Sequence, residues 1–232
     1  ESSLIENCST DHVNRIGINL KGKNNTIRGT TIRNVGNETW RFNRLGYGGS
    51  WGGMGIFIKG PDGHNTVTGN IIDSVGYCGI RFEGPATVVE NNSVSVYTTV
   101  ANDAGGIYTW VGTANYGGGG AGSVIRNNIL FNGRQLSAQE GTDKSHTWSL
   151  GSGIYMDDGT SDVLITGNTC SGNQHGIYLH NTQLCIASAN VSYDNSDQFW
   201  VLNEGSDYLN IVYGSQIVNN VIFSINSQNG VS

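Results

Sequence analysis

Two adjacent carboxylates and a histidine stand at matching places in successive copies of a short repeated segment. Asp157 and Asp158 close the copy that begins at Gly153, and His180 closes the copy that begins at Gly176. A pair of carboxyl groups can hydrolyse a glycosidic bond, because one protonates the leaving oxygen while the other acts as nucleophile or base. His180 would orient Asp157 or tune its pKa. We therefore predict an acid pair that includes Asp157.

The second carboxyl of this pair has two candidates. Glu83 lies two copies before Asp157, roughly 9–10 Å away at the spacing of neighbouring strands, which suits an inverting arrangement. Asp158 is the alternative, although consecutive residues of a regular strand point to opposite faces unless a turn redirects one of them. In the non-functional interpretation Asp157–Gly159 is only a turn, and His180 closes another turn with Asn181.

Two cations precede the acid pair. Lys59 and Arg81 are 22 residues apart and lie on the outward positions of two successive copies of the segment. We expect them to bind hydroxyls or an acidic substituent of the ligand. The alternative interpretation is that Lys59 and Glu83 form an ordinary surface ion pair.

Aromatic side chains accompany the titratable ones on the predicted outward face. They are Tyr108, Trp110, Tyr155 and Tyr178. Aromatic rings stack on the apolar face of a sugar, while neighbouring polar groups bind its hydroxyls. These residues predict an exposed platform for a polysaccharide or oligosaccharide. The alternative is that insertions fold over this face and the rings merely pack beneath them.

The repeated segment predicts the elements that hold these side chains. Its copies begin at Gly17, Gly55, Gly79, Gly106, Gly153 and Gly176, and a degraded copy spans Phe199–Asn203. Side chains alternate along a strand, so Ile154 and Met156 face inward while Tyr155 and Asp157 face outward. Seven copies of one strand indicate a repeat fold in which outward positions stack into columns.

Two outward columns follow from this register. The first is predicted to hold Asn19, Phe57, Arg81, Tyr108, Tyr155, Tyr178 and Val201. The second is predicted to hold Lys21, Lys59, Glu83, Trp110, Asp157, His180 and Asn203. The inward positions are nearly all apolar, which supports the register.

A second repeat series lies between these strands and ends in asparagine. The steps from Asn70 to Asn92 and from Asn168 to Asn190 are both 22 residues. Stacked asparagines form a ladder in which each amide bonds the next and satisfies turn backbone that water cannot reach. One coil is therefore about 22 residues, made of two or three short strands.

Longer steps between copies locate four insertions beside the same strands. They are Gly36–Gly53, Thr98–Ala104, Gly112–Gly122 and Gly133–Ser152. The last contains His146 and Trp148, which we include among the candidate ligand-binding residues. Insertions grouped along one sheet usually wall a binding surface.

These motifs resemble the right-handed parallel β-helix repeat proteins over nearly the whole chain. The resemblance implies an all-β solenoid of about seven coils, with inserted loops on one side and residues 1–232 in a single domain. Lyases, hydrolases, epimerases and adhesins all use this fold. We favour a secreted or cell-surface polysaccharide-active enzyme, most simply a glycoside hydrolase. A non-catalytic glycan-binding or structural β-helix module is the alternative.

Two narrower resemblances concern the chemistry. The Asp-Asp pair with a His about one coil later is similar to the polygalacturonase-type hydrolases, which also carry a further Asp on the preceding coil and a basic pair on the next. Here those places hold Thr109–Val111 and Val201–Glu204, so only the acid-pair idea carries over. Lys59 and Arg81 resemble the Lys base and Arg of the alginate-lyase and chondroitinase-B-like enzymes. That second resemblance implies a polyuronate lyase, with Glu83 as one possible Ca²⁺ ligand; the hydrolase needs no cofactor.

Composition restricts the remaining classes. The 232 residues include 35 Gly and 2 Pro, and only 13% are charged, which suits a turn-rich all-β protein. The net charge is −6 and no basic run exists, so nucleic acid is an unfavoured partner. No apolar run approaches about 20 residues, so no membrane span is predicted. Both ends carry repeat-like sequence, and we expect a monomer or a piece of a longer β-helix.

The four cysteines do not occupy equivalent places in the repeat. They are Cys8, Cys78, Cys170 and Cys185, and no two share a Cys-x-x-Cys spacing. Stacked coils therefore predict no disulfide ladder, and we favour buried free thiols, with one disulfide as the alternative.

Overall fold

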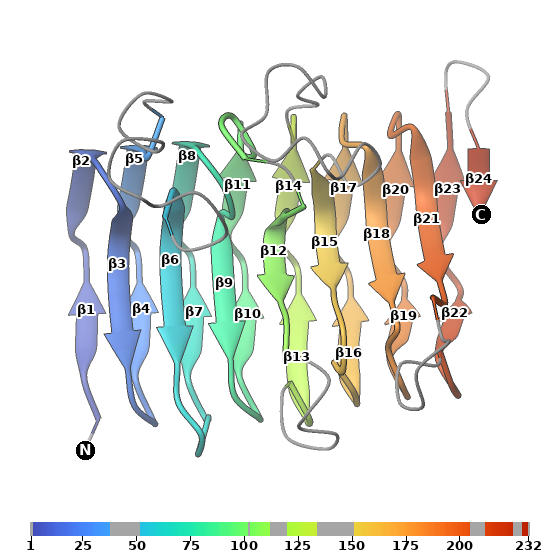
Figure 1. Cartoon of the computed structure of the whole chain (residues 1–232), viewed down its shortest axis with the longest axis horizontal. Coiled ribbons are helices and arrows are strands. Elements are labelled where there is room, and N and C mark those ends of the chain that lie inside the picture. Colours follow the sequence, from blue (N-terminus) through green and yellow to red (C-terminus); the bar gives the residue numbers. More distant parts are fainter. Residues whose placement is uncertain are drawn as a thin grey trace.

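The fold is a parallel β-helix in which every coil contributes one strand to each of three sheets. The computed structural model describes residues 2–37, 52–101, 103–111, 120–133, 151–204, 212–224 and 229–231. Figure 1 shows the coils stacked side by side along the long axis, with the N-terminus and the C-terminus at opposite ends. Within these residues each sheet has eight parallel strands, one more than the seven copies of the Gly-Ile segment.

The strands are short and regularly spaced. Sheet A consists of β1 (Leu4–Glu6), β4 (Thr26–Arg28), β7 (Thr66–Thr68), β10 (Val88–Glu90), β13 (Ser123–Arg126), β16 (Val163–Thr166), β19 (Ile186–Ser188) and β22 (Gln216–Val218). Sheet B consists of β2 (Ser9–Val13), β5 (Thr31–Val35), β8 (Ile71–Val75), β11 (Ser93–Ser95), β14 (Ile129–Phe131), β17 (Thr169–Ser171), β20 (Val191–Tyr193) and β23 (Val221–Phe223). Sheet C consists of β3 (Ile16–Lys21), β6 (Met54–Lys59), β9 (Ile80–Glu83), β12 (Gly105–Thr109), β15 (Ser152–Met156), β18 (His175–His180), β21 (Asp197–Leu202) and β24 (Asn229–Val231).

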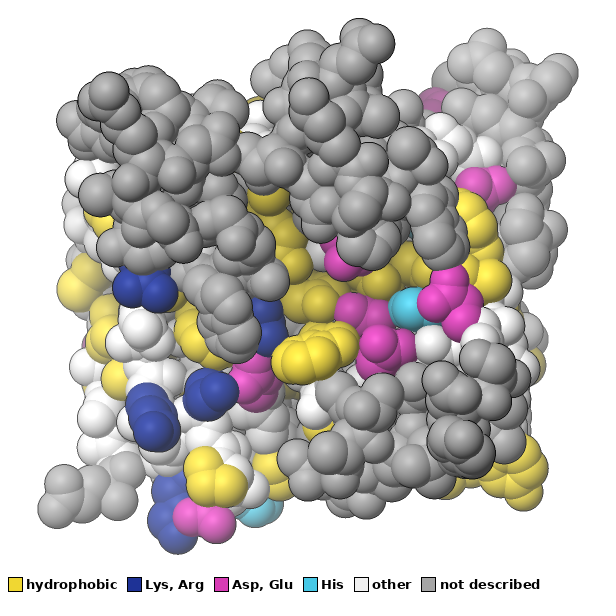
Figure 2. All heavy atoms as spheres, in the orientation of Figure 1, with side chains coloured by type: hydrophobic (Ala, Val, Ile, Leu, Met, Phe, Trp, Pro, Cys, Tyr) yellow, Lys and Arg dark blue, Asp and Glu magenta, His cyan; other side chains and the backbone are white. Residues whose placement is uncertain are grey.

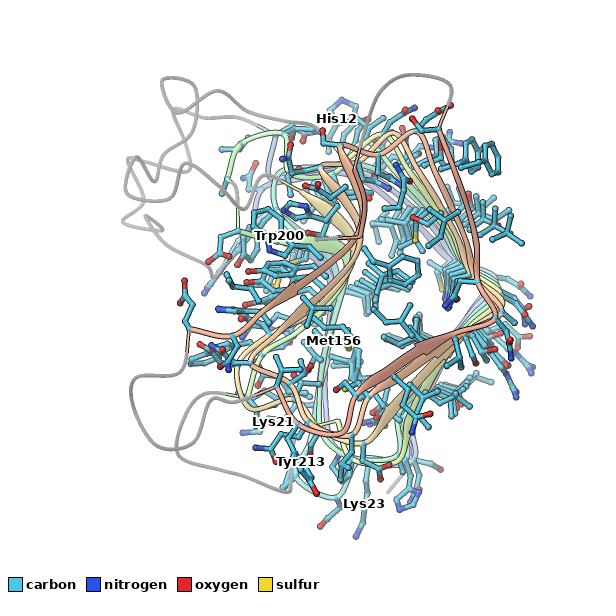
Figure 3. All side chains as sticks on the ribbon, turned by 90° about the vertical axis from the view of Figure 1, so that its right-hand side faces the viewer. His12, Lys21, Lys23, Met156, Trp200 and Tyr213 are labelled. Atoms are coloured by element: carbon cyan, nitrogen blue, oxygen red, sulfur yellow. The ribbon has the colours of Figure 1, made fainter. Side chains whose placement is uncertain are left out.

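The interior of the coil is apolar, as the alternation of side chains predicts. Seen along the long axis in Figure 3, the three sheets enclose the core, with Met156 inside the coil and Trp200 outside it. Ile154, Met156, Ile177 and Leu179 are completely buried in this core. The predicted inward register of sheet C is therefore confirmed for these strands.

The predicted asparagine ladder is present at the turn between sheets A and B. Its side-chain amides bond one another from Asn70 through Asn92, Asn128, Asn168 and Asn190 to Asn220, at N–O distances of 2.9–3.0 Å. Thr30 takes the equivalent place one coil earlier, where its backbone amide donates to Asn70. Because these groups are buried from Asn70 to Asn190, the ladder satisfies turn backbone that would otherwise be left unpaired.

The predicted register of the degraded copy is wrong by one residue. Phe199 pairs with Ile177 and Trp200 pairs with Tyr178, so Trp200 and Leu202 take the outward positions that were assigned to Val201 and Asn203. The place of the usual glycine is therefore held by Gln198. A Cβ at Gly176 would lie 2.0 Å from the Ser192 hydroxyl, so this position is tightly enclosed.

Gln198 is tolerated in this enclosed column because its side chain is buried with partners of its own. Its Nε2 donates to the carbonyl of Asn195, and its Oε1 accepts from the Asn195 side chain. A polar residue that makes local hydrogen bonds thus replaces the glycine. The Gly-Ile signature of the repeat is therefore missing from the sequence of this coil.

All four cysteines are free thiols. Cys78, Cys170 and Cys185 are buried, which agrees with the favoured interpretation, whereas Cys8 is exposed. Burial raises the pKa of the Cys185 thiol to about 11. In the described part of the chain, no helix is long and apolar enough to cross a membrane.

Candidate active site

The outer face of sheet C carries a second apolar cluster. Tyr108, Tyr155 and Tyr178 stack in register across β12, β15 and β18, with ring centroids 5.1 and 4.4 Å apart. Their column is the predicted one, but the exposed platform is not found, because the three residues are only 4%, 2% and 3% exposed. Val100 and Ala101 of the Thr98–Ala104 insertion pack into the same cluster. These rings therefore form a packed base rather than an open stacking surface.

Trp110 is the member of the predicted platform that remains accessible. It follows the last residue of β12 and is 38% exposed. Its indole is therefore the one among these four aromatic residues that a ligand can stack on directly.

The turn after β15 brings both aspartates to the same place. The strand ends at Met156, and the Thr160 amide donates to the Asp157 carbonyl to close the turn. The Asp158 amide donates to Asp157 Oδ1 at 2.8 Å. Asp158 therefore does not follow the strand alternation. The turn after Met156 redirects its side chain, which is one of the two possibilities that the sequence allowed.

His180 links these carboxylates to a further acid. Its Nδ1 lies 2.7 Å from Asp157 Oδ1 and 3.7 Å from Asp158 Oδ1. Its Nε2 lies 3.4 Å from Glu204 Oε2, on the coil that follows. We call Asp157, Asp158, His180 and Glu204 the acid cluster; Figure 2 shows acidic and histidine side chains gathered on this part of the face.

Asn181 holds the cluster from the side. Its Nδ2 is 2.7 Å from Asp158 Oδ1 and 3.1 Å from His180 Nε2, and its Oδ1 accepts from the Glu204 amide. A neutral His180 that donates from Nδ1 can accept this amide hydrogen at Nε2, whereas a protonated one turns a second donor toward Glu204. The Asn181 side chain thus holds the Asp158 carboxylate and the Glu204 backbone beside the His180 ring.

Asp157 is the buried member of the cluster. It is 5% exposed, and its carboxylate contacts the Tyr108 hydroxyl at 2.8 Å, His180 and the Asp158 amide. Burial raises the pKa of Tyr108 well above its ordinary value, so its phenol remains a donor to Asp157. With its oxygens occupied, Asp157 is arranged to orient His180, while Asp158 and Glu204 reach solvent.

Protonation of His180 should stabilise the fold at acidic pH. Burial opposes protonation, but the hydrogen bond and charge of Asp157, helped by two further carboxylates, outweigh it and raise the pKa of His180 above 6.5. A raised folded-state pKa gives stability that is fully present below the unfolded value and is lost as pH rises through the folded value. The unfolding free-energy difference between the wild type and His180→Gln should therefore shrink across that interval.

An NMR titration of the His180 ring gives the same pKa directly. Asp157→Asn removes the main charge partner, so the midpoint should move down in that variant. A wild-type midpoint at or below 6.5 would contradict this account.

A separate charged group lies on the preceding coils. Glu83 Oε2 contacts Lys59 Nζ at 2.8 Å, and Glu83 Oε1 contacts Arg81 Nη2 at 2.7 Å. The Arg81 guanidinium lies between the rings of Phe57 and Tyr108, 5.3 Å from each centroid, and is almost fully buried. The Lys59–Glu83 ion pair of the alternative interpretation is present, and Glu83 is shared with a second cation, Arg81.

The family of the chain follows from the comparison with known sequences. The family described as "Right handed beta helix region" matches residues 54–232, which is more than half of the chain. The chain belongs to this family. No curated protein matches this right-handed β-helix protein.

The comparison with solved structures gives two matches to the same protein. The crystal structure of PfbA, a surface adhesin of Streptococcus pneumoniae, is 14% identical with a TM-score of 0.58, and the match covers 99% of this chain and 64% of that one. A second structure of the same adhesin is 12% identical with a TM-score of 0.41, and the match covers 99% and 66%. The chain thus spans about two thirds of the length of these structures. At 14% identity the likeness to the first of these structures concerns the fold alone.

The β-helix separates the predicted site residues into two groups. Asp157, Asp158 and His180 meet in the acid cluster, whereas Glu83 lies with Lys59 and Arg81 two strands away. His146 and Trp148 lie outside the described residues.

Sequence reasoning missed two polar members of the site. Glu204 was hidden by the register error in β21, since the correct alignment places it just past the strand end, one coil after His180. Asn181 was considered only as a turn partner of His180, although its amide bonds Asp158.

The metal-binding potential of the two groups differs. The ligand atoms of Asp157, Asp158 and His180 lie within 4.8 Å of one another. Both oxygens of Glu83 are engaged with cations, so it offers little to the Ca²⁺ ion of the lyase interpretation. Calcium binding therefore stays a prediction.

Proposed function

We propose that this β-helix protein is a glycoside hydrolase that acts on a polysaccharide outside the cell, with the acid cluster as its active site. One observation carries the proposal: Asp158 and Glu204, both accessible to solvent, flank the two nitrogens of an imidazole that a buried aspartate holds in place. Hydrolysis of a glycosidic bond needs two carboxyl groups in different protonation states.

The proposed roles follow from exposure and contacts. Asp158 and Glu204 are the catalytic pair, one protonating the leaving oxygen and the other activating water. Because an imidazole ring separates them, their arrangement suits the wider spacing of inverting enzymes, about 6.5–9.5 Å between carboxyl groups. Asp157 positions His180, and His180 shares its proton with the flanking carboxylates.

This proposal modifies the pair expected from the sequence. Asp157 remains in the site, but its oxygens already accept hydrogen bonds from Tyr108 and the Asp158 amide. Glu83 is held by two cations, which leaves it poorly placed to exchange a proton with a substrate. Glu204 therefore replaces Glu83 as the proposed partner.

The lyase alternative is less supported by the geometry. Elimination needs a cation that neutralises the substrate carboxylate and a base that removes a proton. Arg81 is buried between two rings and Lys59 is bound to Glu83. Arg81 is therefore not accessible to a substrate carboxylate, and Lys59, as an ammonium paired with Glu83, has no lone pair with which to remove a proton.

A non-catalytic glycan-binding module is the second candidate. The buried tyrosine stack makes the face rigid, and preorganised surfaces favour binding. PfbA is a surface adhesin, which agrees with such a role and with a location at the cell surface.

Incubation with a panel of plant, algal and microbial glycans tests the three alternatives together. New reducing ends without ultraviolet absorbance from an unsaturated product indicate hydrolysis. New reducing ends with that absorbance indicate elimination. Retention of a glycan without any cleavage indicates the binding module and ends the hydrolase proposal.

Trp110 provides a separate prediction for ligand binding. Its exposed indole is proposed to stack on a sugar beside the acid cluster, so Trp110→Ala should weaken glycan binding by about 1–3 kcal/mol. The melting temperature should change little, because the indole is not part of the buried cluster. Isothermal titration and thermal unfolding provide the two readings, and intact binding with a large loss of melting temperature would favour a packing role.

A further inference from the structure

The charges on the outer face of sheet C are divided along the axis. Figure 2 shows Lys and Arg side chains over the β3–β9 side of this face, and acidic and histidine side chains over the β15–β21 side. The second outward column begins with Lys21 and Lys59, which pair in register, and reaches Asp157 three rungs and His180 four rungs beyond Lys59. Trp110 lies between the two ends.

The basic end presents two neighbouring lysines to solvent. Glu83 is shared between Lys59 and Arg81, so Lys59 does not hold this carboxylate alone. Lys21 pairs in register with Lys59 and is exposed, and no acidic side chain in the described part of the chain forms an ion pair with it. Lys59 has a 44% exposed side chain and an ammonium with further donors for a ligand.

The opposite end is strongly acidic. Asp157, Asp158 and Glu204 surround His180, so even a protonated imidazole leaves excess negative charge. A negatively charged substituent placed there would be repelled, and at about 4 Å such repulsion is on the order of several kcal/mol near a protein surface. Exposed charges more than about 10 Å apart are largely screened from each other at moderate salt, so the two ends of the face act separately on a ligand.

From this division we propose that the ligand is a glycan with intermittent negative charge, whose anionic group binds Lys59 and Lys21 while an uncharged stretch crosses Trp110 and enters the acid cluster. The anionic group is a carboxylate or a sulfate, since both accept from an ammonium. The inference rests on the proposed function for the location of cleavage, but its charge pattern is tested by binding alone.

A glycan array with graded charge on fixed backbones tests the proposal. Galacturonans that are fully, partly or not methyl-esterified and celluloses with increasing carboxymethylation are probed, together with lightly and heavily sulfated galactans. We expect the partly charged form of a backbone to bind more tightly than both its neutral and its fully charged form. Preference for the neutral or the fully charged form, or no binding to any series, overturns the proposal.

Lys59→Gln is the decisive variant, with Lys23→Gln as its matched control. Lys23 is an exposed lysine that pairs with Asp62 and follows the end of β3, so it is not part of the outward column. Lys59→Gln should weaken binding of the partly charged glycan by about three- to tenfold, reduce its salt dependence and leave the neutral form unchanged. Equal affinities of the two variants contradict the proposal.

Binding and cleavage can fail independently in this design. The array uses the cleavage-deficient Asp158→Asn protein beside the wild type, so affinity is read without turnover. The expected charge preference without any cleavage by the wild type would refute the hydrolase and keep the ligand assignment. Cleavage of a neutral glycan, with no effect of Lys59→Gln on binding, would support the hydrolase and refute the ligand assignment.

Discussion

Replacing Asp158 with asparagine should reduce glycan turnover by about 10³-fold or more while the protein remains folded. The substitution keeps the size of the side chain and can keep the hydrogen bond with Asn181, but it removes the carboxyl group from the solvent-accessible side of His180. Turnover is measured as new reducing ends, and folding is measured by circular dichroism and thermal unfolding.

Two further variants sharpen this test. Asp62→Asn changes an exposed aspartate that pairs with Lys23, and it should retain full activity. Glu204→Gln should remove the other carboxyl of the pair and delete the opposite limb of the bell-shaped pH profile of kcat/KM. The limb that each variant loses assigns the acid and the base.

Near-wild-type turnover in Asp158→Asn would end the assignment of this residue. If Lys59→Ala were inactive instead and the products were unsaturated, the lyase interpretation would take its place. If Asp157→Asn alone were inactive, with His180 titrating normally, Asp157 would be catalytic rather than positioning.

Among the variants described, Asn128→Ala should lower the free energy of unfolding the most, by on the order of 3–5 kcal/mol. Its side chain donates to the Val89 carbonyl and to Asn168 and accepts two hydrogen bonds from Asn92, all of them buried. Alanine leaves these partners without hydrogen bonds at a turn that water does not reach. The shift of the denaturant midpoint measures the loss.

Asn220→Ala is the matched control at the end of the same ladder. Asn220 makes equivalent hydrogen bonds with Asn190 and the Ala187 carbonyl, but the site is only partly buried. Water can replace the lost amide there, so the cost should be clearly smaller. Equal losses in the two variants would mean that the ladder contributes little through burial.

Local periodicity was enough to predict the fold and most of its register. The period of two along each strand separates Ile154 and Met156 from Tyr155, and the interior of the coil is apolar for that reason. Equal steps between asparagines predicted a ladder, because identical side chains at one turn can bond only if the coils stack. The same logic failed at Gln198, where a buried amide stands in a glycine position.

The tertiary structure alone decided what the outward residues do. Alternation placed Tyr155 outside the coil, but there it is buried in a second cluster that includes Val100 and Ala101 from another segment of the chain. Alternation also separated Asp157 from Asp158, whereas the turn after Met156 brought both to His180. Burial depends on segments far away in the chain, which no strand period encodes.

The pairing of charges was determined in the same way. Sequence placed Lys59, Glu83 and Asp157 in one column, which is correct as far as coil stacking goes. Which acid pairs with which base depends on how far each side chain reaches across neighbouring coils. Glu83 contacts Lys59 and Arg81, and Glu204 contacts His180 from the next coil. A repeat pattern determines the positions of backbones, but hydrogen bonds a few ångströms long determine the chemistry, and only the folded chain brings those atoms together.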